Sequence, residues 1–535
     1  MKNEEVVSMK ISKFNLKASA FVYIYSLLTL VLYNALFCKE LFGVSKSFVV
    51  SSIALIVVFL VLSTVFRIIF FPKITKTFAI FLLFFNTIAS YFMITYNISI
   101  DYIMLLNIFH TDYNEASALL NIRMLIYFTC LFLVPSFIIY KTNIIYTKNN
   151  LKNILKNVLL NLIIVAIILL PISSKADNFY REQKFLRYYL VPTNYIGAVI
   201  SLIKRVDFSS KERVSIADDI KVEKYWENDK KNLIVLIVGE SARAANFSLG
   251  SYSRPTNKDL ITYQNDFVYF KNFYASGTAT AVSVPNMLMH YTRREFKPGV
   301  ELYTDNITNI MEKAGYKTLW RENNTGCENT CNRVETEKPC KKKHCHDEIM
   351  LEKLEDKISQ INQDTFIVLH QRGSHGPDYY NMYPKEFEIY TPVCKQNILS
   401  KCNKESLINA YDNAITYTSY FIKETIRTID KLKDKYNIMM FYASDHGESL
   451  GEKGVYTHSA VYKYAPIEQI HIPALIWMPK STQNDLSIDV KCLKNLAENK
   501  FSHDNIFHTI LGFSGAKTSV YKGDLDILSM CRISK

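Results

Sequence analysis

The chain has 535 residues, 49% of them hydrophobic, and a formal net charge of +13 at pH 7. This length is too great for one small domain. The positive charge is spread over single lysines, and the sequence contains no basic–aromatic motif of an RNA- or DNA-binding module. We therefore predict no nucleic acid partner. Because the first third is rich in apolar residues, an anionic membrane lipid is the more plausible partner.

Five apolar segments in this first third are long enough to cross a membrane. A helix needs about 20 apolar residues to span the hydrocarbon core. None of the segments resembles a cleaved signal peptide, because no short apolar stretch is followed by a small-residue cleavage site. We predict a transmembrane domain over residues 1–175. Its five expected helices lie near 18–43, 48–71, 76–98, 122–140 and 154–173.

Lysine and arginine residues in alternate loops indicate the orientation of this domain. They occur in the N-terminal tail, around Lys73 and Lys76, and again from Lys141 to Lys156. Such loops are usually cytoplasmic. Five crossings then place everything after residue 173 on the outer side, which in a bacterium is the periplasm. We therefore expect a multi-pass inner-membrane protein with a periplasmic domain.

Two stretches on the outer side carry polar or amphipathic patterns. Asn107, Thr111 and Glu115 are spaced by four residues and would share one face of a helix. That face is either simply solvated or a polar strip toward the outer domain. Aromatic and basic residues in 178–205 favour a helix at the membrane surface, or an ordinary interdomain helix. We assign 176–214 to this helix and a linker.

From residue 215 onward, apolar runs alternate with helical patterns, and this part extends to residue 535. The alternation predicts a mostly parallel sheet with helices on both faces. The predicted strands are 232–238, 267–273, 317–321, 365–370, 437–443 and 472–477. The predicted helices are 301–314, 350–362 and 405–434.

The cysteines support an exported domain. Of ten cysteines, eight lie after residue 300, and an even number in an exported domain indicates disulfides. Spacing favours the pairs 327–331, 340–345 and 394–402, which leaves 492–531. A structural zinc knot is the competing interpretation, and its crowded ligands would be Cys340, His344, Cys345 and His346.

Two apolar strands end abruptly in metal-binding side chains. Glu240 follows the strand 232–238, and Asp445 and His446 follow the strand 437–443. In open α/β sheets, ligands bind beyond the carboxyl ends of the strands. Carboxylate oxygens with an imidazole nitrogen form a donor set that suits Zn²⁺. One such loop alone would be an ordinary turn, but the two together predict a metal site.

A segment of small residues, 275–285, contains the hydroxyl groups of Thr278 and Thr280. Small residues let a ligand approach the backbone, and the N–H groups of a following helix can hold an anion. Metal coordination lowers the pKa of a hydroxyl and makes it a nucleophile. Taken by itself the segment is better explained as a helix cap. His375 and His458 could bind a second metal or a phosphate oxygen, although a lone histidine is usually structural.

These motifs together resemble a known family. The sequence GES at 239–241, SGTATAVSVP at 276–285, HQRGSHGP at 370–377 and ASDHGESLG at 443–451 is similar to that of the membrane phosphoethanolamine transferases. This family modifies lipid A and related surface acceptors, and some members confer polymyxin resistance. The resemblance covers nearly the whole chain, including the five apolar segments.

The resemblance implies an α/β/α alkaline-phosphatase-like domain and one zinc ion or more. It implies that Thr280, rather than Thr278, is the nucleophile. The implied zinc ligands are Glu240, Thr280, Asp445 and His446. The implied substrate-binding residues are Asn107, Thr111 and Glu115 near the ethanolamine of the donor, Thr325, and the phosphate-pocket residues His375 and His458.

The implied reaction moves phosphoethanolamine from phosphatidylethanolamine to lipid A or another surface glycan or lipid through a phosphoethanolamine-threonine intermediate. It would lower sensitivity to cationic peptides such as polymyxin, and we expect a monomer. The chain departs from many members at Glu328, where they have lysine, and at Ser276 and Asn286, where they have a cysteine pair.

Other functions fit parts of the pattern. A glycerol-phosphate transferase would share the metal-bearing strand ends. A sulfatase would need a Cys/Ser-x-Pro-x-Arg motif, which the nucleophile loop lacks. A membrane receptor with a degenerate phosphatase-like domain is the non-enzymatic alternative, but every expected metal ligand is present in the sequence.

Overall fold

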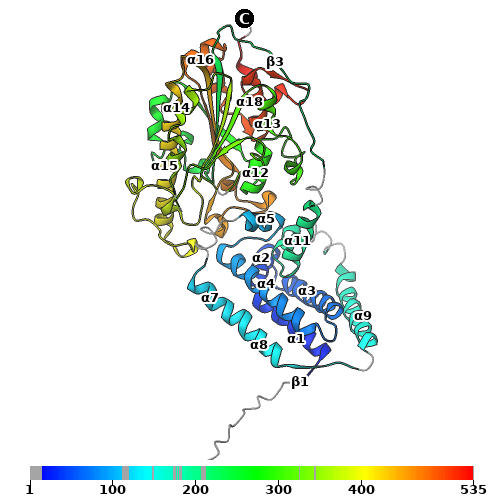
Figure 1. The fold of residues 1–535 in the computed structure, drawn as a ribbon. Helices are drawn as coiled ribbons and strands as arrows, with labels where there is room; N and C mark the ends of the chain where they lie inside the picture. The colour runs from blue at the N-terminus through cyan, green and yellow to red at the C-terminus, as the bar shows by residue number, and fades with distance from the viewer. Residues whose placement is uncertain are drawn as a thin grey trace, which may run out of the picture. The chain divides into compact units, whose positions relative to one another are not determined.

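The computed structural model describes residues 15–110, 120–147, 150–172, 176, 179, 183–206, 212–324, 326–342 and 345–533. The chain divides into two compact units (Figure 1). The first comprises Met1–Ile100 and Leu120–Gly197, and the second comprises Asp101–Leu119 and Ala198–Lys535.

The first unit is helical. Among the described residues, four helices are long and apolar enough to span a membrane, and a bent pair makes up to five. They are α3 (Phe48–Ile69), α4 (Thr75–Tyr96), the run of α7 (Ile122–Phe128), η1 (Thr129–Leu133) and α8 (Val134–Lys141), and α9 (Asn150–Leu169), which η2 (Leu170–Ile172) continues. The bent pair is α1 (Ala18–Tyr33) and α2 (Ala35–Ser45). The prediction of a multi-span membrane protein is confirmed.

The first predicted span is broken at Asn34, where α1 and α2 meet at an angle of 73°. The Asn34 backbone leaves the helical region, with φ −115° and ψ 25°. Its side chain donates to the carbonyls of Thr29 and Val191 and accepts from the N–H of Val191. The Asn34 side chain thus links the break to the backbone at Val191. The apolar composition of 18–43 concealed this break.

Further elements lie outside the span candidates and the large sheet. They include β1 (Asn15–Lys17) paired with β2 (Asn143–Ile145), η3 (Lys184–Tyr188), α5 (Tyr102–His110), α11 (Thr193–Val206), α16 (Lys480–Asp485), α17 (Val490–Leu496), β10 (Ser449–Leu450) paired with β11 (Tyr456–Thr457), and β3 (Lys221–Val222) paired with β14 (Ala516–Lys517).

The described part of the second unit contains an eight-stranded sheet in the order β13-β5-β12-β9-β4-β8-β6-β7. Every neighbouring pair is parallel except the two that involve β12. The strands are β4 (Lys231–Gly239), β5 (Phe267–Tyr274), β6 (Lys317–Glu322), β7 (Glu335–Glu337), β8 (Thr365–His370), β9 (Tyr436–Ser444), β12 (His471–Trp477) and β13 (Lys500–Ser502). The predicted mostly parallel sheet is confirmed, and all six predicted strands occur with bounds within one residue.

Helices cover both faces of the sheet. Figure 1 shows α14 (Leu354–Ser359) and α15 (Lys404–Asp430) on one face, and α12 (Thr280–Met287), α13 (Ile307–Lys313) and α18 (Asp504–Ser514) on the other. Side chains of β4 alternate between two buried hydrophobic clusters, one on each face. This accounts for its uninterrupted apolar sequence. The α/β/α architecture is confirmed.

Two of the predicted helices are shorter in the structure than in the sequence pattern. The pattern 301–314 becomes α13 because Asn306 caps the helix, its side chain accepting from the N–H of Thr308 at 2.9 Å. The pattern 350–362 becomes α14 because Lys353, with φ 55°, interrupts the helical backbone directly before it. The prediction 405–434 corresponds to α15.

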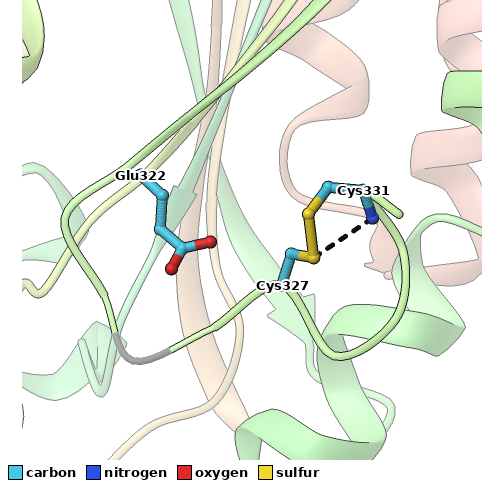
Figure 2. Close-up of side chains that lie close together, drawn as sticks. All are labelled: Glu322, Cys327 and Cys331. Atoms are coloured by element: carbon cyan, nitrogen blue, oxygen red, sulfur yellow. Dashed lines mark hydrogen bonds between the residues drawn. A yellow bond between two sulfur atoms is a disulfide. The ribbon is translucent and has the colours of Figure 1, made fainter. Parts of the chain in front are cut away.

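All eight cysteines of the second unit form the predicted disulfides, Cys327–Cys331, Cys340–Cys345, Cys394–Cys402 and Cys492–Cys531. The alternative zinc knot is therefore wrong, because its two sulfurs are bonded to each other; His344 lies outside the described residues. Figure 2 shows Glu322 facing the Cys327–Cys331 disulfide. Those sulfurs are likewise not thiolates, so this trio is not a metal site.

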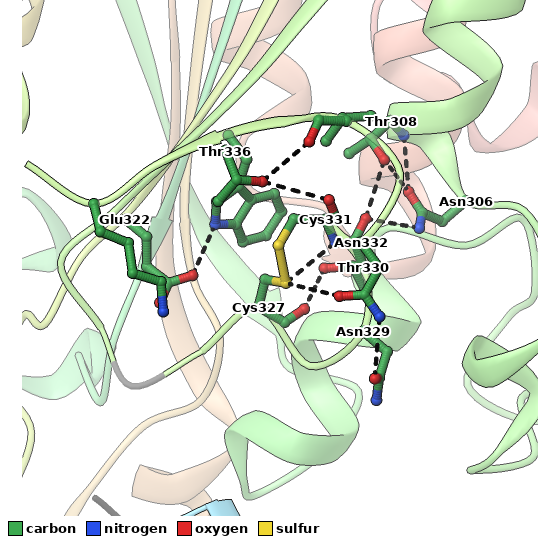
Figure 3. The surroundings of a disulfide bond; sticks show 12 residues. Asn306, Thr308, Glu322, Cys327, Asn329, Thr330, Cys331, Asn332 and Thr336 are labelled. Atoms are coloured by element: carbon green, nitrogen blue, oxygen red, sulfur yellow. Dashed lines mark hydrogen bonds and ion pairs between the residues drawn. A yellow bond between two sulfur atoms is a disulfide. The ribbon is translucent and has the colours of Figure 1, made fainter. Parts of the chain in front are cut away.

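The Cys327–Cys331 loop is bound to the start of α13. The carbonyl of Thr330 accepts from Asn306 Nδ2 at 3.0 Å and from Thr308 Oγ1 at 3.1 Å (Figure 3). Glu322 accepts from the indole N–H of a neighbouring tryptophan and pairs with Lys338 at 3.2 Å. The Cys327–Cys331 loop therefore has a structural role in holding the start of α13. Glu328 is buried within this loop and shares that role.

Candidate active site

Glu240, Asp445 and His446 meet at one edge of the sheet. β4 and β9 pair in parallel and end in register, with Gly239 opposite Ser444. The next residues of both strands therefore share the same crevice. One ligand atom from each of the three side chains lies within 4.8 Å of the others, and all three are buried. His446 Nε2 is 3.4 Å from both Glu240 Oε1 and Asp445 Oδ2.

Thr280 is the first residue of α12 and joins this group. Its hydroxyl donates to Glu240 Oε2 at 3.2 Å and lies 3.3 Å from His446 Nε2. Thr278 is used differently, because its hydroxyl donates to the carbonyl of Ala460 at 2.6 Å and its side chain is buried. The structure thus places Thr280, and not Thr278, among the carboxylates and the imidazole.

The two buried carboxylates of this group, Glu240 and Asp445, favour a bound cation. Burial raises the pKa of the Asp445 carboxyl well above its usual value, and repulsion by Glu240 raises it further. Burial also acts to raise the pKa of Glu240, but the electrostatic influence of the neighbouring His446, His375 and His458 outweighs it and lowers that pKa. Asp445 Oδ2 makes no hydrogen bond within the described chain. A divalent cation would relieve the carboxylate repulsion and bind this orphaned oxygen.

The donor set fits zinc. It offers two carboxylates, a hydroxyl and an imidazole, which are the oxygen and nitrogen donors that Zn²⁺ accepts. His446 Nδ1 lies 2.9 Å from the carbonyl of Gly447. A proton on Nδ1 would satisfy that contact and leave the lone pair of Nε2 directed at the carboxylates, as in many metal sites.

The sequence pattern did not reveal Asn324. This residue lies two positions after β6, and its Nδ2 donates to Glu240 Oε2 at 2.9 Å. Ser241, in a left-handed turn with φ 56°, holds the same carboxylate from the other side by donating to Oε1 at 2.7 Å. In the structure β6 is a neighbour of β8 and its carboxyl end opens on the same edge, which brings Asn324 to Glu240.

His375 and His458 lie beside the first group. Their rings are 5.4 Å apart, and the ring of His458 is 4.4 Å from that of His446. His458 Nδ1 contacts Glu448 Oε2 at 2.9 Å, and Tyr379 donates to the other oxygen of Glu448 at 2.5 Å. Ligand atoms of His446, Glu448 and His458 form a second group within 4.8 Å. The role of Glu448 was not predicted from the sequence, although this residue lies in the motif ASDHGESLG.

Of the predicted ethanolamine-contacting residues, Asn107 is described and the others are not. Asn107, on α5, donates through Nδ2 to Ser459 Oγ at 2.7 Å, directly after His458 in the chain. Both residues belong to the second unit. Thr111, Glu115 and Thr325 lie outside the described residues, so their roles stay predictions.

His503 connects the loop before Thr280 to the end of β9. Its Nδ1 accepts from the N–H of Ser276 at 3.1 Å, and its Nε2 donates to the carbonyl of Ser444 at 2.9 Å. His503 is completely buried, and burial lowers its pKa to about 4. Ser276, one of the two positions without the family's cysteine, is therefore held by this imidazole. The other, Asn286, donates weakly to the carbonyl of Tyr291 at 3.4 Å.

Acid is expected to destabilise the second unit through His503. Protonation would set an N–H on Nδ1 against the N–H of Ser276. Because the pKa is near 6.5 in the unfolded chain and about 4 in the folded chain, this group contributes no change above pH 6.5. It lowers the free energy of unfolding as pH falls from 6.5 to 4, by about 2–3 kcal/mol at pH 4.5.

Tryptophan fluorescence would measure this, because the three tryptophans, Trp226, Trp320 and Trp477, all lie in the second unit. His503→Gln should be less stable at pH 7.5 but should show a shallower loss of stability toward pH 4.5. Equal pH slopes in the variant and the wild-type protein would contradict the assignment.

Comparison with known sequences gives two family matches along the chain. Residues 57–206 match the family described as phosphoethanolamine transferase EptA/EptB. Residues 232–516 match the sulfatase family. The phosphoethanolamine transferase EptA of Escherichia coli strain K12 is 36% identical over 457 residues, which cover 83% of each chain.

Solved structures agree. The integral membrane lipooligosaccharide phosphoethanolamine transferase A of Neisseria meningitidis has a TM-score of 0.92 and 29% identity over 97% of this chain and 100% of its own. The periplasmic domain of EptC from Campylobacter jejuni is 40% identical, with a TM-score of 0.53, over 59% of this chain and 97% of its own. The periplasmic domain of Escherichia coli EptC, solved in complex with Zn, shares the fold at 20% identity and a TM-score of 0.50, over 59% of this chain and 90% of its own. The present chain belongs to the EptA family of phosphoethanolamine transferases.

Proposed function

We propose that this transferase moves phosphoethanolamine from phosphatidylethanolamine to lipid A or a related surface acceptor, with zinc as its metal. The observation that carries the proposal is the position of Thr280, whose hydroxyl touches Glu240 and His446 at the start of α12. The similar protein from Neisseria is a lipooligosaccharide phosphoethanolamine transferase, which supports an acceptor of this class.

In the first half-reaction, Thr280 Oγ1 forms a bond to the phosphorus of phosphatidylethanolamine. The bond from phosphorus to the glycerol oxygen breaks, which leaves phosphoethanolamine on Thr280. The hydroxyl proton of Thr280 leaves toward Glu240 Oε2, the oxygen to which it is already hydrogen-bonded at 3.2 Å. The departing glycerol oxygen takes a proton from His458, which Glu448 orients, and diacylglycerol leaves as an alcohol.

In the second half-reaction, a phosphate or hydroxyl oxygen of the acceptor attacks the same phosphorus. The bond to Thr280 Oγ1 breaks, and the hydroxyl recovers its proton from Glu240. His458 receives the proton of the attacking hydroxyl or of a monoprotonated acceptor phosphate. Bound Zn²⁺ would be held by Glu240, Thr280, Asp445 and His446, and would supply positive charge that favours the ionised hydroxyl and neutralises the transferring group. Asn324 and Ser241 keep the Glu240 carboxylate oriented throughout.

Both substrates are lipids, and the membrane unit confines the enzyme to the surface that holds them. Such confinement raises the effective concentration of each reactant. We propose that the transmembrane domain occupies residues 1–175, the juxtamembrane helix and linker 176–214, and the catalytic domain 215–535. The periplasmic location of the C. jejuni EptC domain supports a periplasmic catalytic domain here.

The test uses purified full-length protein with a fluorescent phosphatidylethanolamine and lipid A. We expect release of labelled diacylglycerol and a lipid A product whose mass increases by one phosphoethanolamine. A product heavier by one glycerol phosphate would identify a glycerol-phosphate transferase instead. In cells, expression of the protein should lower sensitivity to polymyxin. If the enzyme consumes phosphatidylethanolamine but leaves lipid A unmodified, the acceptor is another surface molecule.

A further inference from the structure

Asp347 is a buried carboxylate outside the group of candidate metal ligands. Its hydrogen bonds connect its own segment with Asn323 and with residues 371–373. Asp347 is 3% exposed and lies two residues after the Cys340–Cys345 disulfide. Its Oδ1 accepts from Asn323 Nδ2 at 2.8 Å and from the N–H of Arg372 at 2.9 Å. Its Oδ2 accepts from Gln371 Nε2 at 3.2 Å and from the N–H of Gly373 at 3.0 Å.

These four N–H donors stabilise the negative charge of Asp347 in place of a positively charged side chain. Asp347 forms no ion pair with a described residue, so its charge is compensated by N–H groups alone. A carboxylate is expensive to bury, and it persists where several N–H groups donate to it. Two of the donors are backbone groups that a buried turn could not otherwise satisfy. Asp347 therefore fixes the conformation of residues 371–373.

The turn that Asp347 holds lies directly against Glu240. Gly373, with φ 54°, packs so closely that an added Cβ would be 2.6 Å from the carbonyl oxygen of Glu240. The N–H of Ser374 donates to that same oxygen at 3.0 Å, and the N–H of Gln371 donates to the carbonyl of Val238 at 3.0 Å. Hydrogen bonds and close packing thus hold the turn at residues 371–374 against the end of β4.

Asp347 reaches Glu240 by a second path, through Asn323. The next residue, Asn324, donates to Glu240 Oε2 at 2.9 Å, and the same Asn323 amide also donates to the carbonyl of Cys345 at 3.1 Å. Beyond the turn, His375 faces His458. The Asp347 carboxylate therefore fixes the backbone that packs against Glu240, the position of the Asn324 amide that donates to Glu240, and the loop that carries His375.

We infer that Asp347 is a positioning residue that holds Glu240 and the His375 loop in the arrangement that binds metal and transfers phosphoethanolamine. Its hydrogen bonds go to Asn323 and to residues 371–373 rather than to the candidate metal ligands, and it acts through them. The inference rests on the proposed function for the metal and the transfer. Groups that orient metal ligands in this way typically change metal affinity or activity by about 10- to 100-fold when they are lost.

The test compares Asp347→Asn with Asp526→Asn in full-length protein. Asn keeps the shape of Asp347 but turns an NH₂ group toward N–H donors. Asp526 is an equally buried carboxylate that accepts from Tyr521 and from the N–H of Leu528 in the C-terminal segment, so it controls for the loss of a buried charge. Asn323→Ala, which removes one donor only, is the milder variant to use if Asp347→Asn does not fold.

Three readouts separate positioning from general instability. Hydrogen exchange of peptides covering 370–375 should be faster in Asp347→Asn. Zinc affinity, measured by competition with a chelator, should weaken by about 10- to 100-fold, and kcat should fall by a similar factor with little change in KM. Asn323→Ala should shift all three in the same direction but less. Asp526→Asn should leave the exchange of 370–375 and the zinc affinity unchanged.

Unchanged loop exchange, or faster loop exchange with wild-type zinc affinity and kcat, would overturn the positioning role. So would an equal loss in Asp526→Asn. Wild-type protein that binds no zinc or releases no diacylglycerol would contradict the proposed function instead. In that case faster exchange in Asp347→Asn would still show that Asp347 holds the loop, but its role toward metal would be rejected.

Discussion

Thr280→Ala is expected to lower the rate of diacylglycerol release by about 10⁴-fold or more, because the variant has no atom to carry the transferred group. The hydroxyl of Thr280 contacts both Glu240 and His446, and no other hydroxyl in the described nucleophile loop does so. The measurement is a time course with fluorescent phosphatidylethanolamine and purified enzyme.

Thr278→Ala is the matched control, since it removes an identical side chain two residues away. Its hydroxyl donates to the carbonyl of Ala460, so we expect modest destabilisation and activity of the same order as the wild-type enzyme. Thr280→Ser, which restores a hydroxyl, should recover a large part of the activity. Full activity in Thr280→Ala, or a greater loss in Thr278→Ala, would reject the assignment of the nucleophile.

Asp445→Asn is expected to weaken zinc binding and to lower kcat, each by more than about 100-fold, because it removes a charged ligand rather than a group that orients one. It should nevertheless not destabilise the metal-free protein. The buried Asp445 is repelled by Glu240, and both this repulsion and burial raise its pKa. The neutral amide of Asn removes both the repulsion by Glu240 and the cost of burying a charge. The melting temperature of the metal-free protein should therefore be unchanged or higher.

Asp485→Asn provides the comparison for a carboxylate outside the site. Asp485 is partly exposed and pairs with Lys230 at 3.0 Å, and such a pair is worth at most about 1 kcal/mol. This variant should bind zinc normally. An Asp445→Asn protein that keeps its zinc, or whose metal-free form unfolds at a clearly lower temperature, would contradict the metal site described above.

The sequence predicted the sheet closely, and it predicted that the candidate metal ligands would meet, for a shared physical reason. Strands buried on both faces are continuous apolar runs, so β4 and β9 could be bounded where charge begins. Parallel strands place their carboxyl ends on one edge, and Glu240, Asp445 and His446 followed from that rule. The short edge strand β7, of sequence ETE, offers no such contrast and was missed.

Contacts between distant segments were beyond reach of the sequence pattern. Asn324 and Asp347 occur in polar loops that look like many others. Their contacts form only when β6 and β8 bring the segments after them, which contain Asn324 and the Asp347-bound residues 371–373, next to Glu240. The break at Asn34 was hidden in the same way, because its side-chain partners include Val191, far along the chain. The choice of Thr280 over Thr278 came from the family resemblance, and the structure supplies its geometric reason.

The covalent step can be observed directly by mass spectrometry of the enzyme after incubation with phosphatidylethanolamine alone. With no acceptor to complete the reaction, one phosphoethanolamine should remain on the protein, and peptide mapping should place it on Thr280. A modification on another residue, or an unmodified enzyme that still transfers phosphoethanolamine when lipid A is added, would contradict a covalent intermediate on Thr280.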